Sequence, residues 1–509
     1  MTAEASQQPV IDFLSDPASH GGAPVKRIDT HAASVFLAGE RALKIKRAVR
    51  FPFLDFSTLK RRKEACEAEI AVNRALAPSI YRAVVPITRA PNGRLAINGK
   101  GEPVEWAVVM RRFDETQTLD HLAETGKVGE ALADALGRTV AAAHRVAPTV
   151  TNAHFAEALA RIIEQNEAEL ASEPYLFSLP ELRALANATR DAFGRVKQLL
   201  EARERAGLVR RCHGDLHLGN IVLIDGKPML FDAIEFDDRI ATGDVLYDLA
   251  FLLMDLIERG LHHAANIVFN RYLAETRRIH DLDALAALPL FMSVRAAIRA
   301  KVTAAKLRQD GSQAELTQSA RDYAGLARKL LAPAKPRLIA LGGLSGTGKS
   351  LLARALATGM PPLPGAVVLR SDVERKALFD AGETERLPEI AYAAETTAKV
   401  YAVLAEKARR ATTAGHSVIV DAVFARPGER ADIAKSASGV AFQGLFLVAD
   451  LDTRLARVGS RAGDASDAGL DVARNQELFD LGHIAWSKVD ASGTPEETLI
   501  RAEAMLDRN

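Results

Sequence analysis

The sequence has too little cysteine, too little net charge and too few long apolar runs for several broad classes of protein. Cys66 and Cys212 are its two cysteines, too few for a disulfide framework, which favours a reducing compartment. The net charge is +1, so no global electrostatic attraction to nucleic acid or to a membrane surface is expected. No apolar run approaches the roughly 20 residues that span a bilayer. The best candidate, residues 246–257, is interrupted by two aspartates.

The N-terminal residues and the overall composition predict an ordinary globular protein. Residues 1–16 contain no basic segment followed by an apolar core, so we expect no signal peptide. With the scarcity of cysteine, this predicts a soluble, cytoplasmic protein. The 509 residues are 48% hydrophobic and 26% charged, and a chain of that length is expected to form roughly two to four domains. Residues 1–30 are expected to be irregular, apart from a short helix near residues 10–14.

Three oxygen-bearing side chains in residues 212–238 form the first candidate centre. Asp215 and Asn220 lie in a predicted loop, and Asp232 follows a predicted hairpin with its turn at residues 225–226. Phosphoryl transfer from ATP uses an aspartate to orient and deprotonate the acceptor hydroxyl, and an asparagine and an aspartate to hold Mg²⁺. The spacing matches the layout of eukaryotic-type kinases. We therefore predict that Asp215 is catalytic and that Asn220 and Asp232 are metal ligands.

This stretch resembles a known family. His-Gly-Asp at residues 213–215, Asn220, and Phe-Asp at residues 231–232 resemble the aminoglycoside phosphotransferase (APH) and choline-kinase-like family. Protein kinases have Asp-Phe-Gly where this chain has Asp-Ala-Ile-Glu, and that departure argues against a protein substrate. The resemblance implies a bilobal, protein-kinase-like fold. It also implies that Asp244 and Asp248 support the catalytic loop.

In such a fold a lysine of the N-terminal lobe contacts the ATP phosphates, and a glutamate of the next helix holds that lysine. A predicted strand over residues 42–47 alternates so that Lys44 and Lys46 share one face. We prefer Lys44, and Lys46 stays open. The helix predicted over residues 57–76 resembles the APH helix, and Glu69 is our choice for the glutamate.

A second phosphate-binding motif follows a proline-containing linker at residues 332–336. An apolar strand over residues 337–341 leads into Gly-Gly-Leu-Ser-Gly-Thr-Gly-Lys-Ser and then a helix, which satisfies the P-loop pattern. The glycines let backbone N–H groups surround the phosphates, the lysine reaches the β- and γ-phosphates, and the serine hydroxyl ligates Mg²⁺. The residues predicted to bind the nucleotide are Gly343, Ser345, Gly346, Thr347, Gly348, Lys349 and Ser350.

The remaining segments predict a doubly wound α/β domain with sites at the carboxyl ends of its strands. Asp421 ends a predicted strand and resembles a Walker-B acid that holds Mg²⁺ through water; a strand-end cap is the alternative. Asp372 and Arg375 resemble the acceptor-side motif of small P-loop kinases, including the polynucleotide-kinase-like and zeta-toxin-like groups. That resemblance implies that Asp372 activates an acceptor hydroxyl and that Arg375 steadies the acceptor. A helix cap with a surface arginine is the alternative.

Three arginines share one face of a later predicted helix. Arg454, Arg457 and Arg461 recur at three- and four-residue spacing. They resemble a lid that closes over the transferring phosphate, and we predict that Arg454 and Arg457 contact the nucleotide. A solvated basic face is the alternative.

The whole chain resembles bacterial proteins described as bifunctional aminoglycoside phosphotransferase/ATP-binding proteins. We expect an APH-like kinase domain over residues 1–331, with an α+β N-terminal lobe over about 30–112 and a C-terminal lobe over about 113–331, and an α/β P-loop domain over residues 337–509. The resemblance implies ATP and Mg²⁺ at two sites that transfer phosphate to small-molecule hydroxyl groups. The acceptor is sugar-like or aminoglycoside-like in the first domain and unknown in the second.

Two alternatives stay open. In one, the P-loop domain is a regulatory or ATP-sensing module beside a single active kinase. In the other, it phosphorylates a nucleotide-sugar or a nucleic-acid 5′-hydroxyl. The net charge of +1 and the lack of a basic stripe interleaved with aromatic residues weigh against long nucleic acid. The acceptors and the oligomeric state are left open.

Overall fold

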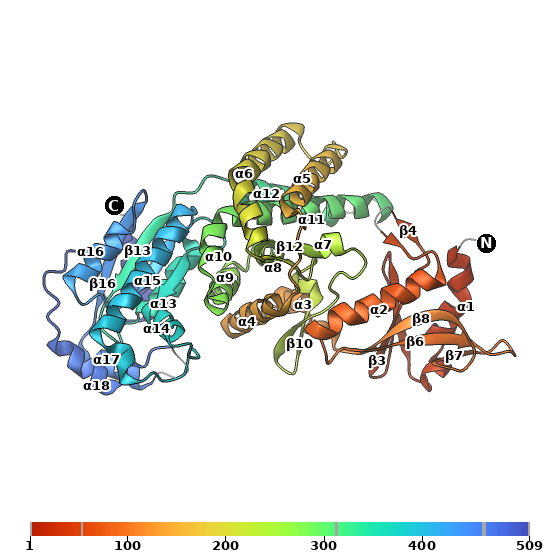
Figure 1. Cartoon of the computed structure of the whole chain (residues 1–509), viewed down its shortest axis with the longest axis horizontal. Helices are drawn as coiled ribbons and strands as arrows, with labels where there is room; N and C mark the ends of the chain where they lie inside the picture. The colour runs from red at the N-terminus through yellow and green to blue at the C-terminus, as the bar shows by residue number, and fades with distance from the viewer. Residues whose placement is uncertain (1–2, 52–53, 311–313, 461–464, 507–509) are drawn as a thin grey trace. The chain divides into compact units, whose positions relative to one another are not determined.

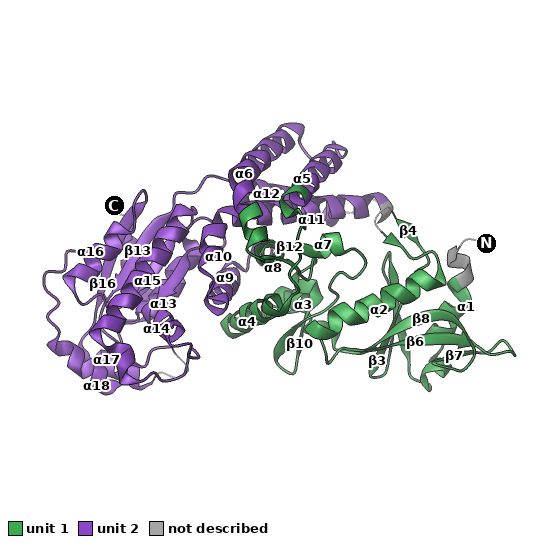
Figure 2. Ribbon diagram, viewed as in Figure 1, with its two compact units in different colours: residues 1–157, 201–255 green, residues 158–200, 256–509 purple. Residues whose placement is uncertain are grey.

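The computed structural model describes residues 3–51, 54–310, 314–460 and 465–506 (Figure 1). The chain divides into two compact units, one of residues 1–157 with 201–255 and one of residues 158–200 with 256–509 (Figure 2). None of the helices within the described residues has the length and apolarity needed to cross a membrane.

Unit 1 contains a six-stranded antiparallel sheet in the order β1-β2-β3-β8-β6-β7. Alternation along β3 sends Leu43 and Ile45 to a core shared with Leu14 of helix α1. Lys44 and Lys46 therefore lie on the opposite face of the strand. The elements are α1 (Ala3–Ser15), β1 (Val25–Asp29), β2 (Ala33–Ala38), β3 (Arg41–Lys46), β4 (Arg50–Phe51), β5 (Leu54–Asp55), α2 (Leu59–Leu76), β6 (Tyr81–Arg89), β7 (Leu95–Ile97) and β8 (Glu102–Arg111).

The second part of unit 1 contains the hairpin that was predicted to precede Asp232. Strands β10 and β11 pair from Ile221 opposite Leu230 to Ile224 opposite Lys227. Asp225 and Gly226 both have positive φ, 51° and 74°, which is typical of the tight turns that join hairpin strands. The elements are α3 (Leu119–Glu124), α4 (Glu130–Val146), β9 (Val209–Arg211), β10 (Ile221–Ile224), β11 (Lys227–Leu230), α7 (Asp238–Ala241), β12 (Thr242–Asp244) and α8 (Val245–Glu258).

Unit 2 combines helices with a five-stranded parallel sheet in the order β14-β15-β13-β16-β17. Ile339, Ile419 and Leu445 from neighbouring strands form its core. The parallel sheet confirms the predicted α/β class of this part. The strands are β13 (Arg337–Gly342), β14 (Val367–Arg370), β15 (Val418–Asp421), β16 (Ala441–Val448) and β17 (Ser487–Asp490).

Helices from before and after the predicted linker belong to unit 2. Those before it are most of α5 (Phe155–Ala171) and α6 (Leu179–Arg205), with α9 (His262–Thr276), α10 (Ile279–Asp283), α11 (Leu288–Asp310) and α12 (Ala314–Leu330). Those after it are α13 (Lys349–Gly359), α14 (Ser371–Leu378), α15 (Ala394–Thr413), α16 (Pro427–Lys435), α17 (Leu451–Gly459), α18 (Leu470–Asn475) and α19 (Pro495–Leu506).

Helix α9 binds the edge of the parallel sheet through two asparagines. Asn270 accepts a hydrogen bond from the Val368 N–H at 2.7 Å and donates one to the Ala366 carbonyl at 3.1 Å. Asn266 donates to the carbonyls of Pro364 and Ala366, each at 3.2 Å. These side chains satisfy backbone groups at and just before the edge strand β14, which would otherwise be open to pairing with another chain. The parallel sheet is thus joined to helices that precede residues 332–336.

Candidate functional site

The first candidate site is a cluster of charges from three separate parts of unit 1. Lys44 Nζ on β3 lies 2.9 Å from Glu69 Oε1 on α2 and 2.7 Å from Asp232 Oδ1 after β11. Lys46 Nζ lies 2.6 Å from Glu69 Oε2 and also pairs with Glu235. Both lysines therefore share Glu69, and the structure brings Lys44 beside the predicted metal ligand Asp232.

Mutual attraction keeps this cluster ionised although it is largely buried. Burial alone would lower the pKa of Lys44, but Asp232 and Glu69 outweigh it and raise that pKa well above its ordinary value. Burial alone would raise the pKa of Asp232, but the charge of Lys44 and its hydrogen bond leave that pKa lowered. Asp232 is therefore a carboxylate at neutral pH, the form that binds a divalent cation.

The other two predicted residues of this site lie together in the loop before β10. Asn220 Nδ2 donates to the Asp215 carbonyl at 2.9 Å and to Asp215 Oδ2 at 3.1 Å. His217 Nδ1 accepts from the Gly219 N–H at 3.1 Å, so its proton belongs on Nε2, which lies 3.4 Å from Asp215 Oδ2. The Phe231 N–H donates to the Asn220 carbonyl at 3.0 Å and so holds the residue before Asp232 against this loop.

Buried carboxylates hold the backbone of the loop. Asp248 accepts hydrogen bonds from the N–H groups of Gly214 at 2.8 Å and His213 at 3.3 Å. Asp255 accepts one from the Leu218 N–H at 2.8 Å. Because both side chains accept hydrogen bonds from backbone N–H groups of the loop, these contacts hold the loop backbone in place.

The resemblance implied that Asp244 and Asp248 support the loop. Asp248 contacts it directly, whereas Asp244 pairs with Arg203 and accepts from the Leu246 N–H. Asp255, which lies within an apolar helix without a motif, was missed.

The second candidate site begins at the loop between β13 and α13, where the glycines meet geometric demands. Gly343, Gly346 and Gly348 have φ of 140°, 88° and 87°, values that L side chains rarely adopt. A Cβ on Gly343 would lie 2.6 Å from the Leu447 carbonyl oxygen, and one on Gly346 would lie 2.6 Å from the Arg454 carbonyl oxygen. The loop therefore has the compact backbone that the P-loop pattern predicted.

Polar side chains from three elements meet beside this loop. Ser350 Oγ donates to Asp421 Oδ2 at 2.5 Å, which joins the start of α13 to the end of β15. Arg370, at the end of β14, donates from Nη2 to Ser350 Oγ at 3.1 Å. Lys349 Nζ donates to the Leu344 carbonyl at 3.1 Å. Sequence reasoning missed Arg370, although its place at a strand end, two residues before Asp372, was a usable signal.

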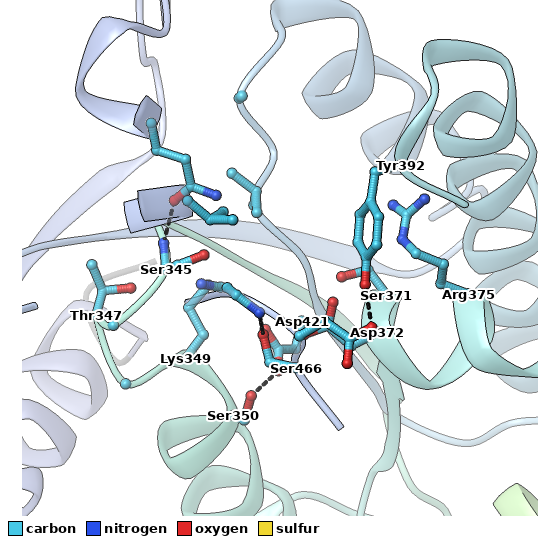
Figure 3. A pocket seen from close by; sticks show the side chains of 18 of the residues that line it. Ser345, Thr347, Lys349, Ser350, Ser371, Asp372, Arg375, Tyr392, Asp421 and Ser466 are labelled. Carbon is cyan, nitrogen blue, oxygen red and sulfur yellow. Dashed lines mark hydrogen bonds between the residues drawn. The ribbon is translucent and has the colours of Figure 1, made fainter. Parts of the chain in front are cut away.

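The predicted acceptor residues lie beyond this cluster. Asp372 is in the first turn of α14, whose N-cap is Arg370, so Asp372 is not the capping residue. Burial and the nearby Asp421 raise the pKa of Asp372, although a hydrogen bond with Ser466 opposes them. The Arg375 guanidinium lies 5.0 Å from the centre of the Tyr392 ring. In Figure 3, Asp421 lies between Ser350 and Asp372, and Tyr392 and Arg375 lie on the side of Asp372.

One cavity of about 1190 Å³ is lined both by the P-loop and by the predicted acceptor residues. Its wall includes the P-loop residues 345–350 together with Asp372, Arg375 and Asp421. Asp467 also lines the cavity and accepts hydrogen bonds from Lys376 Nζ at 2.7 Å and from the Leu387 N–H at 3.0 Å. The cavity thus contains both the phosphate-binding loop and the predicted acceptor residues.

The arginines predicted to form a lid have other partners. Arg454 is buried: its Nε donates to the Ser345 carbonyl at 2.9 Å, and it also pairs with Glu477. Arg457 lines the cavity but donates to the carbonyls of Ala491 at 2.7 Å and Gly493 at 2.6 Å. Arg461 lies outside the described residues. The structure therefore brings Arg457 to the cavity wall and Arg454 to the P-loop backbone.

One further contact to the P-loop was not expected from the sequence. Gln476 Oε1 accepts a hydrogen bond from the Ser345 N–H at 2.7 Å, and Gln476 lines the cavity. Ser345 is one of the residues predicted to bind the nucleotide, and its backbone N–H is paired with Gln476 in this structure. Gln476 comes from a short 3₁₀ turn at Gln476–Leu478 that carries no motif.

Known proteins are similar to nearly the whole chain or to one part of it. A protein of Mycobacterium tuberculosis strain H37Rv, Rv2004c, described as uncharacterized, is 31% identical over 488 residues, which cover 93% of this chain and 94% of that protein. A choline/ethanolamine kinase family protein from Mesorhizobium loti is 18% identical and covers 64% of this chain and 95% of its own, with a TM-score of 0.41. A gluconokinase from Sinorhizobium meliloti is 20% identical and covers 34% and 94%, with a TM-score of 0.26.

Models of two families match separate stretches. The phosphotransferase enzyme family, APH, matches residues 32–286, which contain Lys44 and the loop around Asp215. A family described as an AAA domain, AAA_33, matches residues 338–477, which contain the P-loop. Both families imply the use of ATP. The chain therefore belongs to the APH phosphotransferase enzyme family and carries a P-loop domain of the AAA_33 type after its kinase-like domain.

Proposed function

We propose that this protein transfers the γ-phosphate of ATP to hydroxyl groups of small molecules at two separate centres. The observation that carries the proposal is the ion pair of Lys44 with both Glu69 and Asp232. A kinase of this family needs a lysine for the ATP phosphates, a glutamate that positions it and an acid for the metal. The acceptor of this centre is proposed to be a sugar-like or aminoglycoside-like alcohol.

At the first centre, Asp215 is the proposed base for the acceptor hydroxyl. The proton on His217 Nε2 faces Asp215 Oδ2, and Asn220 contacts the same oxygen, so this carboxylate oxygen is oriented by two donors. Asn220 and Asp232 provide oxygen atoms suited to Mg²⁺. Bound Mg²⁺ would supply charge neutralisation on the transferring phosphate.

At the second centre, Lys349 and the P-loop backbone are proposed to bind the nucleotide phosphates. The hydroxyl of Ser350 donates to the carboxylate of Asp421 at 2.5 Å, and these two residues would hold Mg²⁺, with Asp421 acting through water. Asp372 is the proposed base, and a raised pKa brings a carboxylate nearer to the basicity that proton transfer at neutral pH needs. Arg375 is proposed to steady the acceptor.

A regulatory role for the P-loop domain is the second candidate. It is favoured by the contact of α9 with β14, because β14 ends at Arg370, which hydrogen-bonds Ser350. A change in the bound nucleotide would therefore be transmitted through Arg370 and β14 to α9, a helix that precedes the linker. In that case the cavity would bind ATP without transferring phosphate to an acceptor.

The test is ³¹P NMR of ATP with a panel of aminoglycosides, amino sugars and nucleosides, using the intact protein beside Asp215→Ala and Lys349→Ala. We expect at least one phosphorylated product that disappears in only one variant, which assigns that acceptor to one centre. Hydrolysis of ATP without any acceptor product would contradict the two-centre proposal and favour the regulatory role.

A further inference from the structure

A second cavity lies among three helices of unit 2. It has a volume of about 280 Å³ and lies between α5, α6 and α11. Most of its wall is apolar, and it shares no lining residue with the cavity at the P-loop. Its apolar residues include Ile163, Leu170, Leu182, Ala186, Val294 and Ala297.

The size and lining of this cavity distinguish it from a packing defect. Protein interiors rarely contain voids much larger than a water molecule, and small-molecule pockets begin at roughly 300 Å³. A buried water needs about two to four polar partners, which a wall of this kind offers at few points. The hydroxyls of Thr189 and Ser293 already donate to the carbonyls of Leu185 and Ala327, each at 2.8 Å. The wall therefore offers water few partners, and apolar cavities of this kind take up apolar molecules.

One buried polar group on the wall is left without a partner. Asn166 is 4% exposed, and its Oδ1 has no hydrogen-bond partner among the described residues. Its Nδ2 lies 3.4 Å from the Val294 carbonyl of α11. Reversing the amide would direct Oδ1 at that carbonyl oxygen, so the present orientation is the favourable one. A buried acceptor without a partner has lost its hydrogen bonds to water, and a ligand with a hydrogen-bond donor would replace one of them.

The cavity has a route to solvent at one end. Leu179, at the start of α6, lines it and is 49% exposed. Glu167 lines it as well, and its carboxylate pairs with Arg190 Nη1 at 2.8 Å. Arg183 lines the cavity too, but it is exposed. With Glu167 already paired and Arg183 at the solvent side, the apolar part of the wall favours an uncharged molecule.

We propose that this cavity binds a small, mainly apolar molecule with a single N–H or O–H donor, of the phenol or aliphatic-alcohol class. The donor would bind Asn166 Oδ1 and the apolar body would fill the space between α5, α6 and α11. This site is separate from the two proposed phosphotransfer centres and does not depend on them.

The experiment measures binding of 4-propylphenol and of its methyl ether, 4-propylanisole, to the full chain by isothermal titration calorimetry. We expect saturable binding of the phenol and binding about tenfold weaker for the ether, which lacks the donor. Ala186→Leu and Ala297→Leu fill the cavity from two helices and should each abolish binding. Ala184→Leu, on an exposed position of α6, is the matched control and should bind normally.

Three results would overturn the proposal. They are the absence of saturable phenol binding, equal affinity for phenol and ether, and normal binding by both filling variants. Asn166→Leu tests the acceptor separately, since it should bind the phenol and the ether equally. Discrimination that persists in Asn166→Leu would show that Asn166 is not the acceptor. Thermal unfolding of each variant checks that loss of binding is not loss of folding.

Discussion

The two candidate phosphate sites differ in what holds them together. In unit 1, the site consists of charged side chains from separate elements, with Lys44 and Lys46 both paired to Glu69. In unit 2, it consists of a glycine-rich backbone loop and the Ser350–Asp421 hydrogen bond. Breaking a buried ion pair leaves an uncompensated charge, whereas loss of a P-loop side chain leaves the loop backbone in place. The first site is thus expected to couple function to stability and the second to separate them.

The largest expected effect is a loss of phosphate transfer at the first centre alone. Asp215→Asn removes the proposed base, so transfer at the first centre should fall by about 10²- to 10⁴-fold, while transfer at the second stays unchanged. The measurement is kcat for each product, resolved by ³¹P NMR. Asp225→Asn, at the exposed turn of the hairpin, is the control. Equal loss of both activities would contradict two independent centres.

The next effect concerns stability. Glu69→Gln leaves Lys44 and Lys46 with less compensating charge, so the free energy of unfolding of unit 1 should fall by about 3–5 kcal/mol. Urea unfolding followed by tryptophan fluorescence measures it. Glu67→Gln, exposed on the same helix, should change stability by less than about 0.5 kcal/mol. If both variants lose the same stability, the charge cluster is not what holds this site.

A buried histidine of unit 2 is expected to make the protein less stable in acid. His416 is fully buried, neither ring nitrogen has a partner among the described residues, and burial lowers its pKa to about 3. Between pH 6.5 and 3 the unfolded chain binds this proton and the folded chain does not. Stability should therefore fall as the pH falls through that window, by about 1.4 kcal/mol per pH unit.

His416→Leu should flatten this dependence, and the midpoint of thermal unfolding measured from pH 7 to pH 5 is the readout. His483→Leu, at an exposed position, should leave the slope as it is. The same slope in wild type and His416→Leu would show that other groups cause the acid sensitivity.

A smaller effect concerns the contact of α9 with the parallel sheet. Asn270→Ala removes hydrogen bonds to the Val368 N–H and the Ala366 carbonyl and should lower the stability of unit 2 by about 1–2 kcal/mol. Asn187→Ala, an exposed asparagine of the same unit, is the control. Thermal unfolding checks both, and an unchanged midpoint for Asn270→Ala would mean that this contact does not stabilise the sheet edge.

The features that the sequence predicted well are those that follow from regular residue patterns. Alternation in β3 predicted the face that carries Lys44, and turn chemistry at residues 225–226 predicted the hairpin before Asp232. The N-terminal prediction was partly wrong, because residues 3–15 form a longer helix and residues 25–29 form a sixth strand of the sheet. That strand lacks alternating burial, since it pairs only with β2 at the sheet edge.

Contacts that depend on tertiary folding were beyond the sequence. Gln476 and Asp467 line the P-loop cavity from segments without motifs, and Arg370 hydrogen-bonds Ser350. The helical spacing of Arg454 and Arg457 predicted a shared face correctly, but it could not reveal that carbonyl groups occupy both guanidinium groups. Their roles at the nucleotide, like those of the other candidate residues, stay predictions.

The central claim is that one chain binds ATP at two sites of different construction. Calorimetric titration with a non-hydrolysable ATP analogue and Mg²⁺ tests it most directly, in wild type, Asp232→Asn and Lys349→Met. We predict two equivalents bound by wild type and one by each variant, with each variant losing a different site. A single equivalent in wild type, or unchanged stoichiometry in both variants, would contradict the claim.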